Sequence, residues 1–550
     1  MNTQNLVVGL DQFGRTVEPA HGNNQKQVGI FFWAWLGQPF HSGFWDATEI
    51  LKLPDGADIL YRQDNKEHSP SGTAHWWGEP LWGYYNSMDE WVIRKQMEML
   101  TTAGIDYIAF DTTNAVTYEA VYVPVMKVIT NMIDEGFAPP RVTFYTHTRS
   151  MPTVKRLYES IYKPGVYPKS WYRQNGKPFI IAFTDPAADL AAEGITDHAQ
   201  STYKPERFPE EIEQFFTFKR PQWPCNDTVY PDGLPWVEWI YPQPLHGDVM
   251  NVTVASHPSV PMSFTRTRGL ENWGRGWDPV RRLNVPEDAL RGTFFERQWD
   301  NVVARADELG MVFVGGWNEW VAYKQIWDGE YMLCDAADME LSRDIEPMKG
   351  GYEDAFYLRL IHHVRRFKGV GTAPISAGNG LYRKVDTSGM ARDEHSCVKD
   401  VRYTQKAPKN ALTQVEVTND AETVTFRITC KADITPFDGD ASWMNLYIGL
   451  GTPAPKGWES YEYLVRGKDT TQMTVSVGIL SADKTVTEMA TVPYRIDGRT
   501  LTVTLPRALL PAYSLYFKAT DSVDGEDIMG TYTSGSAMPM GRLSYLYTLQ

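Results

Sequence analysis

The sequence predicts a (β/α)8 barrel of the TIM type followed by an antiparallel β-sandwich. Over residues 28–370, short apolar runs alternate with helical patterns at a spacing of 30–70 residues, which is typical of a parallel sheet. Polar residues follow nearly every apolar run, as they do at the carboxyl ends of barrel strands. After Gly369 the pattern changes to short alternating segments with no long helix, which indicates a sandwich.

Seven apolar runs are the predicted barrel strands. They cover residues 28–35, 105–111, 141–147, 178–185, 235–242, 251–257 and 311–317, and we expect an eighth strand within the poorly patterned residues 321–349. The predicted helices cover residues 89–103, 118–135, 151–162, 206–220, 287–309 and 352–368. No glycine-rich phosphate loop follows the first strand, so a closed barrel fits better than an open doubly wound sheet.

Four further segments complete the predicted domain organisation. Residues 1–27 are polar and are expected to form a loosely attached arm, and residues 36–88 form a long irregular insertion of the kind that is usually functional. Residues 371–385 hold Gly, Pro, Ser and Asn and indicate a linker. Residues 386–550 form the sandwich, with strands at 414–417, 423–430, 443–449, 474–480, 500–505, 513–519 and 543–549. The sandwich residues Trp443, Trp458, Tyr461 and Tyr463 either stack on a glycan or belong to the core.

Charge and hydropathy limit the partners of this 550-residue chain. Its net charge is -15 and it has no cluster of Lys or Arg, which argues against nucleic acid or an anionic membrane as a partner. No run of 18 apolar residues exists, so no membrane span is predicted. Residues 1–11 lack the pattern of a signal peptide, so we expect a cytoplasmic protein, or a periplasmic or secreted one if a leader has been lost. The oligomeric state is left open.

The four cysteines give no indication of a metal site or a disulfide framework. Cys225, Cys334, Cys397 and Cys430 are widely spaced and form no CxxC pair. A bridge between Cys397 and Cys430 is conceivable, but no pattern supports it. We therefore expect neither a metal nor a cofactor.

The most informative stretch is residues 311–320, MVFVGGWNEW. It begins as an apolar run typical of a strand buried on both faces, and it ends on Glu319 held between Trp317 and Trp320. Gly315 and Gly316 allow another backbone or a ligand to come close. A carboxylate at the carboxyl end of such a strand is where barrel enzymes place their chemistry. The alternative is a surface glutamate beside two core tryptophans.

Breaking a glycosidic bond requires two carboxyl groups, one that protonates the leaving oxygen and one that acts as base or nucleophile. Glu319 is the predicted general acid, because its tryptophan neighbours would desolvate it and raise its pKa. Asp111 directly follows the strand 105–111 and is the predicted base or nucleophile; otherwise it caps the next helix. We expect strands 28–35, 105–111 and 311–317 to converge, so that the two acids face one hollow walled by aromatic side chains.

Aromatic residues make up 13% of the chain, and many tryptophans have polar neighbours, which a sugar-binding cleft would explain. The predicted substrate-binding residues are Trp33, Trp35, Trp76, Trp77, Glu79, Tyr84, Asn114, His147, Asp185, Trp239, His257, Arg268, Glu271, Trp273, Trp317, Asn318 and Trp320. Several have another interpretation: Asp185 as a helix N-cap, Glu271 as an ion-pair partner, and Arg268, with Arg266 and Arg275, as part of a solvated loop rather than a site for an acidic sugar. His147 and His257 end strands, but no HxH or HExxH spacing supports a metal site.

The GWNEW motif at 316–320 resembles that of glycoside hydrolase families 71 and 99, and so do the segments VGIFFWAW (28–35), HWWGEPLWGYY (75–85) and IDYIAFDTTN (105–114). The resemblance covers roughly residues 28–370 and implies a (β/α)8 barrel acting on a glycan. The C-terminal region resembles a family 9 carbohydrate-binding module. Family 99 acts on α-mannosides and places both catalytic carboxylates in one WNEWxE motif. Glu319 matches the first; the second position is Ala322, which cannot transfer a proton, so the partner is expected from another strand, and Asp111 is the choice.

These observations lead to a main hypothesis and two alternatives. The main hypothesis is a glycoside hydrolase that cleaves an oligo- or polysaccharide by paired-carboxylate chemistry. The first alternative is a non-catalytic glycan-binding protein on a degenerate barrel, which Ala322 favours. The second is a polysaccharide lyase that uses a His or Tyr base on a uronic acid, and the prominence of carboxylates speaks against it.

Overall fold

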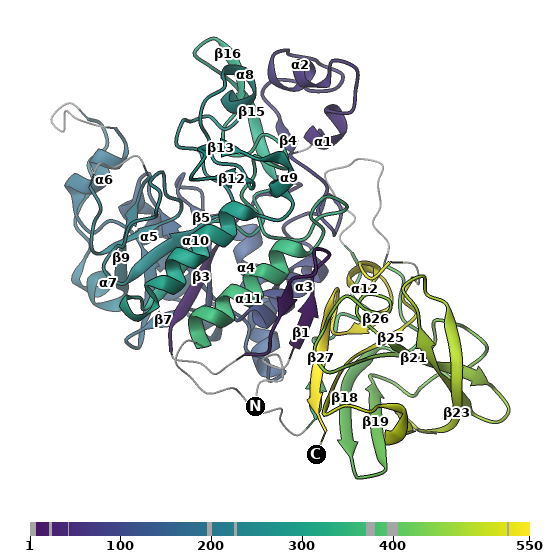
Figure 1. Ribbon diagram of the computed structural model, residues 1–550. Helices are drawn as coiled ribbons and strands as arrows, with labels where there is room; N and C mark the ends of the chain where they lie inside the picture. The colour runs from purple at the N-terminus through teal and green to yellow at the C-terminus, as the bar shows by residue number, and fades with distance from the viewer. Residues whose placement is uncertain are drawn as a thin grey trace. The chain divides into compact units, whose positions relative to one another are not determined.

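The computed structural model describes residues 7–20, 25–41, 43–194, 201–224, 228–369, 380–392, 405–524 and 527–549 (Figure 1). The described chain divides into two compact units. One comprises Gln25–Tyr352, and the other comprises the residues before Gln25 and from Glu353 onward. Cys225 and Cys397, with most of the predicted linker, lie outside the described residues, whereas Cys334 and Cys430 are free thiols.

The first unit is built on eight parallel strands that form a nearly closed barrel. Their order in the sheet is β10 (Gly233–Pro235), β9 (Thr217–Gln222), β8 (Lys177–Ile181), β6 (Arg141–Thr146), β5 (Tyr107–Thr112), β3 (Gln27–Phe32), β14 (Met311–Val314) and β11 (Val249–Val252). The short β7 (Arg173–Gln174) pairs antiparallel with β8. At the seam between β11 and β10, Asn251 Nδ2 donates to the carbonyls of Pro235 at 3.2 Å and Trp236 at 3.0 Å. The predicted TIM-type barrel followed by a separate antiparallel sheet is confirmed.

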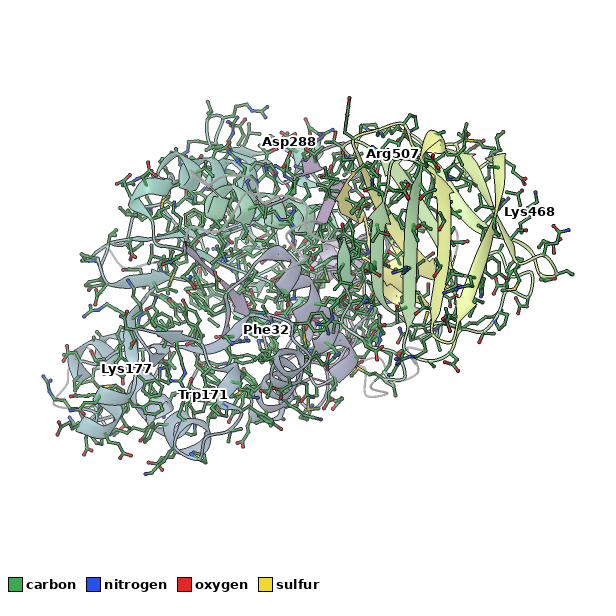
Figure 2. All side chains as sticks on the ribbon, turned by 90° about the horizontal axis from the view of Figure 1, so that it is seen from below. Phe32, Trp171, Lys177, Asp288, Lys468 and Arg507 are labelled. Atoms are coloured by element: carbon green, nitrogen blue, oxygen red, sulfur yellow. The ribbon has the colours of Figure 1, made fainter. Side chains whose placement is uncertain are left out.

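Helices cover the outside of the barrel, and aromatic side chains fill its inside. The helices of this unit are α3 (Glu90–Ala103), α4 (Glu119–Asp134), α5 (Ser150–Leu157, continued by a π-helical turn 158–162), α6 (Pro186–Ala192), α7 (Glu210–Phe215) and α10 (Thr293–Ala304), with shorter ones between. Inside, Phe31, Tyr145 and Phe313 belong to one fully buried cluster. Phe32, labelled in Figure 2, alternates with Phe31 along β3 and packs edge-on against Phe110 at 5.8 Å. Strands buried on both faces explain the unbroken apolar runs.

Three sequence predictions for this unit are wrong. Residues 206–220 are not one helix: α7 is short and β9 follows it, and the polar Lys219 and Arg220 in this strand hid the apolar signal. Residues 235–242 leave the sheet after Pro235, because their tryptophans pack against the end of the barrel instead of pairing as a strand. Residues 321–349 hold no barrel strand: β15 (Val321–Trp327) and β16 (Glu330–Leu333) form a hairpin, and the eighth barrel strand is β9.

The insertion 36–88 is more ordered than predicted. It contains α1 (Ala47–Ile50), α2 (Gly56–Tyr61) and β4 (Ala74–Trp76), and β4 pairs antiparallel with β15. In Figure 1 these elements lie with the β15–β16 hairpin above the barrel strands β3 and β5. The fully buried ammonium of Lys324 on β15 donates to the carbonyls of Ile59, Gln63 and Ser69 and to the Ser69 hydroxyl. The three N–H groups of one side chain therefore serve four neighbouring acceptors of the insertion.

We expect Lys324→Met to lower the free energy of unfolding by about 3 kcal/mol, because buried carbonyls lose their donor. The insertion should also become a site of proteolysis between residues 52 and 72, where the wild type resists. Urea unfolding and limited proteolysis measure the two effects. Lys52→Met is the matched control, since Lys52 pairs only with Glu49 on the surface. Equal stability of the two variants would contradict this role for Lys324.

The second unit is an antiparallel sheet that folds over on itself. Its strands follow the order β17 (Leu381–Arg383), β18 (Leu412–Asn419), β19 (Thr423–Cys430), β24 (Thr500–Pro506), β23 (Val486–Asp497), β22 (Thr474–Leu480), β21 (Tyr463–Asp469), β20 (Asn445–Leu450), β25 (Ser514–Asp521), β27 (Leu543–Thr548), β1 (Val7–Leu10) and β2 (Thr16–Val17), and β26 (Ser536–Met538) pairs with β25. Tyr382 stacks on Tyr545 at 4.6 Å and Phe426 contacts Phe517 edge-on at 5.4 Å, so the two halves of the sheet pack face to face.

The N-terminal residues are part of this second sheet. Val7 pairs with Tyr545 and Gly9 with Leu543, so residues 7–17 are not the loosely attached arm that their polarity suggested. Their backbone pairs with the edge of the sheet, and this pairing leaves little trace in the periodicity of their side chains. Helix α11 (Ala355–Gly369) also groups with this unit: Arg365 donates to the carbonyls of Val7 and Glu18. Among the residues that the structure describes, no helix is long and apolar enough to span a membrane.

Candidate active site

Three adjacent strands carry the candidate catalytic groups. β14 pairs with β3 and β3 pairs with β5, all parallel, so the segments at their carboxyl ends lie side by side. Asp111 is the fifth residue of β5, and Glu319 follows β14 after a short turn. The charge of Asp111 acts on Glu319 and raises its pKa. The predicted convergence of the three strands is therefore present in the structure.

Asn318 joins the GWNEW motif by hydrogen bonds to Trp33, which directly follows β3. Its Oδ1 accepts the backbone N–H of Trp33 at 2.9 Å, and its Nδ2 donates to the Trp33 carbonyl and the Tyr85 hydroxyl, both at 3.2 Å. The backbone N–H of Trp317 donates to the carbonyl of Phe31 at 3.0 Å. Because all polar groups of the Asn318 side chain are engaged and buried, this residue fixes the turn, whereas the sequence had suggested contact with substrate.

Trp317 and Trp320 of the GWNEW motif are buried, together with Trp77 of the insertion. Trp320 stacks on Trp77 with ring centroids 4.2 Å apart and 16° between the planes. Trp77 Nε1 donates to the Glu319 carbonyl at 2.9 Å, and Trp320 Nε1 donates to the Glu346 carboxylate at 2.6 Å. Trp317 is fully buried as well. Their faces are covered by protein, so these three rings hold the turn in place and offer no exposed platform.

Glu319 lies in a cluster of charged groups centred on Arg343. The Arg343 Nη2 donates to Glu319 Oε2 and lies 3.6 Å from the Asp335 Oδ1, and Nη1 lies 2.9 Å from the His257 Nδ1. The Glu319 side chain is 8% exposed, whereas that of Asp335 is 38% exposed. The Glu319 backbone N–H also donates to Asp344 at 2.6 Å. The carboxyl groups of Glu319 and Asp344 are thus buried, whereas that of Asp335 faces solvent.

The charges of this cluster do not balance. Burial raises the pKa of Glu319 well above its usual range, with contributions from Asp335, Asp344 and Asp111, while Arg343 opposes the shift. Burial also raises the pKa of Asp111, and it raises the pKa of Asp344 to about 6. The pKa of His257 is lowered by burial and by Arg343, so its ring stays neutral. The carboxyl groups of this cluster outnumber its guanidinium groups, which disfavours the ionisation of all of them at once.

Aromatic rings follow the carboxyl ends of several barrel strands. Trp239 contacts the His257 ring edge-on at 5.5 Å, and His147 stacks on Trp223 at 4.0 Å. Trp35 stacks on Tyr323 of β15 at 6.0 Å. Burial lowers the pKa of His147 to about 4, so this ring too is neutral. Of the predicted sugar-binding residues, His257 contacts Arg343 of the cluster, and Trp239 contacts His257.

Several other predicted binding residues have protein partners. Glu79 pairs with Lys349, Glu271 with Arg282 at 2.7 Å, and Arg268 with Glu330 at 3.1 Å. Tyr84 donates to Asp46 at 2.8 Å. These contacts satisfy the polar groups without a ligand.

The remaining predicted residues are structural or lie on the surface. Asp185 is exposed and caps α6 by accepting the N–H of Ala187, and Asn114 is exposed. Trp273 stacks on Trp277 at 4.7 Å in a separate apolar cluster. Trp33 belongs to the barrel core and Trp76 to the buried strand β4. Asp111 accepts from the N–H and hydroxyl of Thr113, at 3.0 and 2.7 Å, the geometry of a local turn.

Sequence reasoning missed Asp335, Arg343, Asp344 and Glu346. All four lie in residues 321–349, whose weak periodicity gave no strand or helix on which to place them. The available signal was the large number of charged residues in a segment that has neither the helical nor the strand pattern of a surface element. Within the described part of the chain, no group of three or more His, Cys, Asp or Glu side chains is arranged to hold a metal ion.

Comparisons with known proteins give little further information. No protein-family model matches the chain, and no curated protein matches it. Among solved structures, an endo-α-mannosidase of glycoside hydrolase family 99 from Bacteroides thetaiotaomicron aligns with a TM-score of 0.35 and 14% identity, over 62% of this chain and 97% of that one. The same enzyme in complex with bis-tris-propane aligns with a TM-score of 0.35, at 13% identity and equal coverage. Similarity at this level does not bear on the activity of this chain.

Proposed function

We propose that the chain is a glycoside hydrolase whose chemistry takes place at Glu319 and Asp335. The observation that carries the proposal is that both carboxylates bind the same nitrogen, Nη2 of Arg343. Their nearest oxygens are therefore no more than about 6 Å apart, an upper bound that is compatible with the separation of about 5–5.5 Å typical of retaining enzymes. They lie at the carboxyl edge of a parallel barrel, where such enzymes act.

The environments of the two carboxyl groups suggest different roles. Glu319 is buried and its pKa is raised, which suits a general acid that protonates the leaving oxygen. Asp335 is partly exposed and lies beside Arg343, a position that suits a nucleophile. Asp111, the partner predicted from sequence, stays a candidate: it acts on Glu319 through its charge, but its carboxylate is engaged by Thr113.

A glycan-binding protein without catalysis is the second candidate. Two observations favour it: the ion pair between Glu319 and Arg343, which occupies the acid in this structure, and the place of Ala322 opposite His75 in the β15–β4 pair, where no carboxylate can act. Incubation with a panel of polysaccharides separates the two proposals. Release of new reducing ends supports the hydrolase, and binding without release supports the second candidate.

For the hydrolase we expect Asp335→Asn to lower turnover by at least about 100-fold, because the amide is neither a nucleophile nor a base. Azide should restore part of the activity by taking the place of the carboxylate. Proton NMR of the first product formed by the wild type should show retention of the anomeric configuration. Asp328→Asn is the matched control, since Asp328 is an exposed residue of the β15–β16 turn. Full activity of Asp335→Asn would return the role to Asp111.

A further inference from the structure

The second unit holds a hollow of 380 Å³ on the outer face of its sheet. Three adjacent strands, β21, β20 and β25, form its floor. On β20, Tyr447 pairs with Leu464 on one side and Lys518 on the other, and Asn445 pairs with Thr520, so these side chains share one face. The alternate residues of β20, such as Leu446, point into the core instead.

One polar group in the floor lacks a partner. Asn445 is 7% exposed, and its Nδ2 donates to the carbonyl of Ala441 at 2.9 Å. Its Oδ1 is buried and accepts no hydrogen bond from any residue that the structure describes. A buried acceptor left unsatisfied costs about 1–3 kcal/mol, so it marks a position where a donor on a ligand would bind favourably.

The hollow also contains the guanidinium of Arg466. Arg466 lies on β21, and the charge of Glu488 acts on it, but no ion pair or side-chain hydrogen bond joins Arg466 to another described residue. Lys468, two residues further along the same strand and labelled in Figure 2, is paired with Glu488. Glu488 thus pairs directly with Lys468 and acts on Arg466 at longer range.

The other charged groups that line the hollow are engaged. Lys406 pairs with Asp524 at 2.7 Å, and Asp440 lies 3.0 Å from Lys409. The Lys518 ammonium donates to the carbonyls of Pro539 and Leu543. Asp527 accepts the backbone N–H of Met529 at 2.9 Å with one oxygen, which leaves the other for a ligand hydroxyl.

Two aromatic rings supply an apolar wall. Tyr447 and Trp458 lie 5.3 Å apart with 41° between their planes. The ammonium of Lys484 lies 4.7 Å from the centre of the Trp458 ring, which places a second positive charge beside this wall. A ligand with one apolar ring face and one anionic group matches both features.

From these features we infer that the hollow binds a hexuronic acid, free or at the end of a glycan. Its carboxylate would bind Arg466 in a charge-assisted hydrogen bond. Ring hydroxyls would donate to Asn445 Oδ1 and to Asp527, and the apolar face of the pyranose would lie against Tyr447 and Trp458. The inference does not depend on the proposed hydrolase, because every residue in it belongs to the second unit.

Isothermal titration calorimetry of the full chain with D-glucuronate and D-galacturonate tests the inference. We expect at least one uronate to bind, and D-glucose, D-galactose and benzoate to bind at least tenfold more weakly. Arg466→Gln should weaken uronate binding by about tenfold or more, since it removes a charge-assisted hydrogen bond. Arg495→Gln is the matched control, because Arg495 is exposed on β23. Trp458→Ala should weaken binding as well.

Four outcomes would overturn the inference. They are absence of binding by both uronates, equal binding of a neutral hexose, equal binding of benzoate, and uronate binding that Arg466→Gln leaves unchanged. Glu319→Gln should not affect uronate binding. A loss in that variant would place the ligand in the barrel and would also contradict the inference, whereas an inactive barrel with intact uronate binding would count only against the proposed hydrolase.

Discussion

Glu319→Gln should lower glycan turnover by about 10²–10⁴-fold, the contribution that general acid catalysis makes in enzymes. The amide keeps an oxygen that accepts from Arg343 but has no proton to give to a leaving group. Turnover is measured as the rate of release of reducing ends from the polysaccharide that the wild type cleaves best. Turnover of a substrate with a good leaving group, such as a nitrophenyl glycoside of the same sugar, should fall much less. Such a leaving group departs with little need of protonation.

The fold should survive this change. Removing one partner of a buried ion pair commonly costs about 3–5 kcal/mol, because the other charge is left uncompensated. Here Asp335 and Asp344 stand beside Arg343, so we expect a smaller cost and an unchanged circular dichroism spectrum. Glu308→Gln serves as control, since Glu308 precedes the amino end of β14, on the face opposite to the site, and pairs with Arg305. Wild-type turnover in Glu319→Gln would remove Glu319 from the chemistry.

Much of the barrel could be predicted from the sequence because its strands are buried on both faces. Residues 107–110 and 311–314 are apolar without interruption, and helices of the barrel carry clear signals, such as the Asp89 N-cap and the Gly104 C-cap of α3. The strand β9 escaped prediction for the opposite reason. It holds Lys219 and Arg220, and its place in the sheet is decided by neighbours far away in the sequence.

The candidate site was predicted only in part, since its chemistry depends on a contact across a loop. Glu319 has a sequence signature, but Arg343 and Asp335 have none, and only the path of residues 321–349 brings them to the strand end. The tryptophans were misjudged for a related reason. Sequence identifies a ring that can stack but not what it stacks on, and Trp77 and Trp320 stack on each other.

Glu346 joins the turn that carries Glu319 to the insertion 36–88 and to α3. Its removal should have the largest effect on stability. The fully buried carboxylate accepts from Trp82 and Tyr85 at 2.8 Å and from Gln96 and Trp320 at 2.6 Å. These donors come from the insertion 36–88, from α3 and from the GWNEW motif at 316–320. Glu346→Ala leaves all four without an acceptor, so we expect a loss of about 4 kcal/mol or more in the free energy of unfolding, near the upper end for single substitutions. Urea unfolding measures it.

The same carboxyl group should make stability depend on pH. Burial raises the pKa of Glu346 from 4.5 to about 7, against the opposing effect of its hydrogen bonds. The folded chain then binds the proton more tightly than the unfolded chain, so the stability that this group contributes is present below pH 4.5 and declines as the pH rises toward 7. The decline should reach about 3 kcal/mol.

Glu346→Gln isolates this contribution, because the amide does not titrate. The difference in unfolding free energy between wild type and Glu346→Gln should shrink as the pH rises from 4.5 to 7, and it should be constant above pH 8. Glu308→Gln, changed in the same way at an exposed position, should show no such trend. A difference that is constant from pH 4.5 to 8 would mean that Glu346 is ionised throughout, held by its four donors alone. In that case the GWNEW motif is held by an ionised Glu346 rather than by a neutral one.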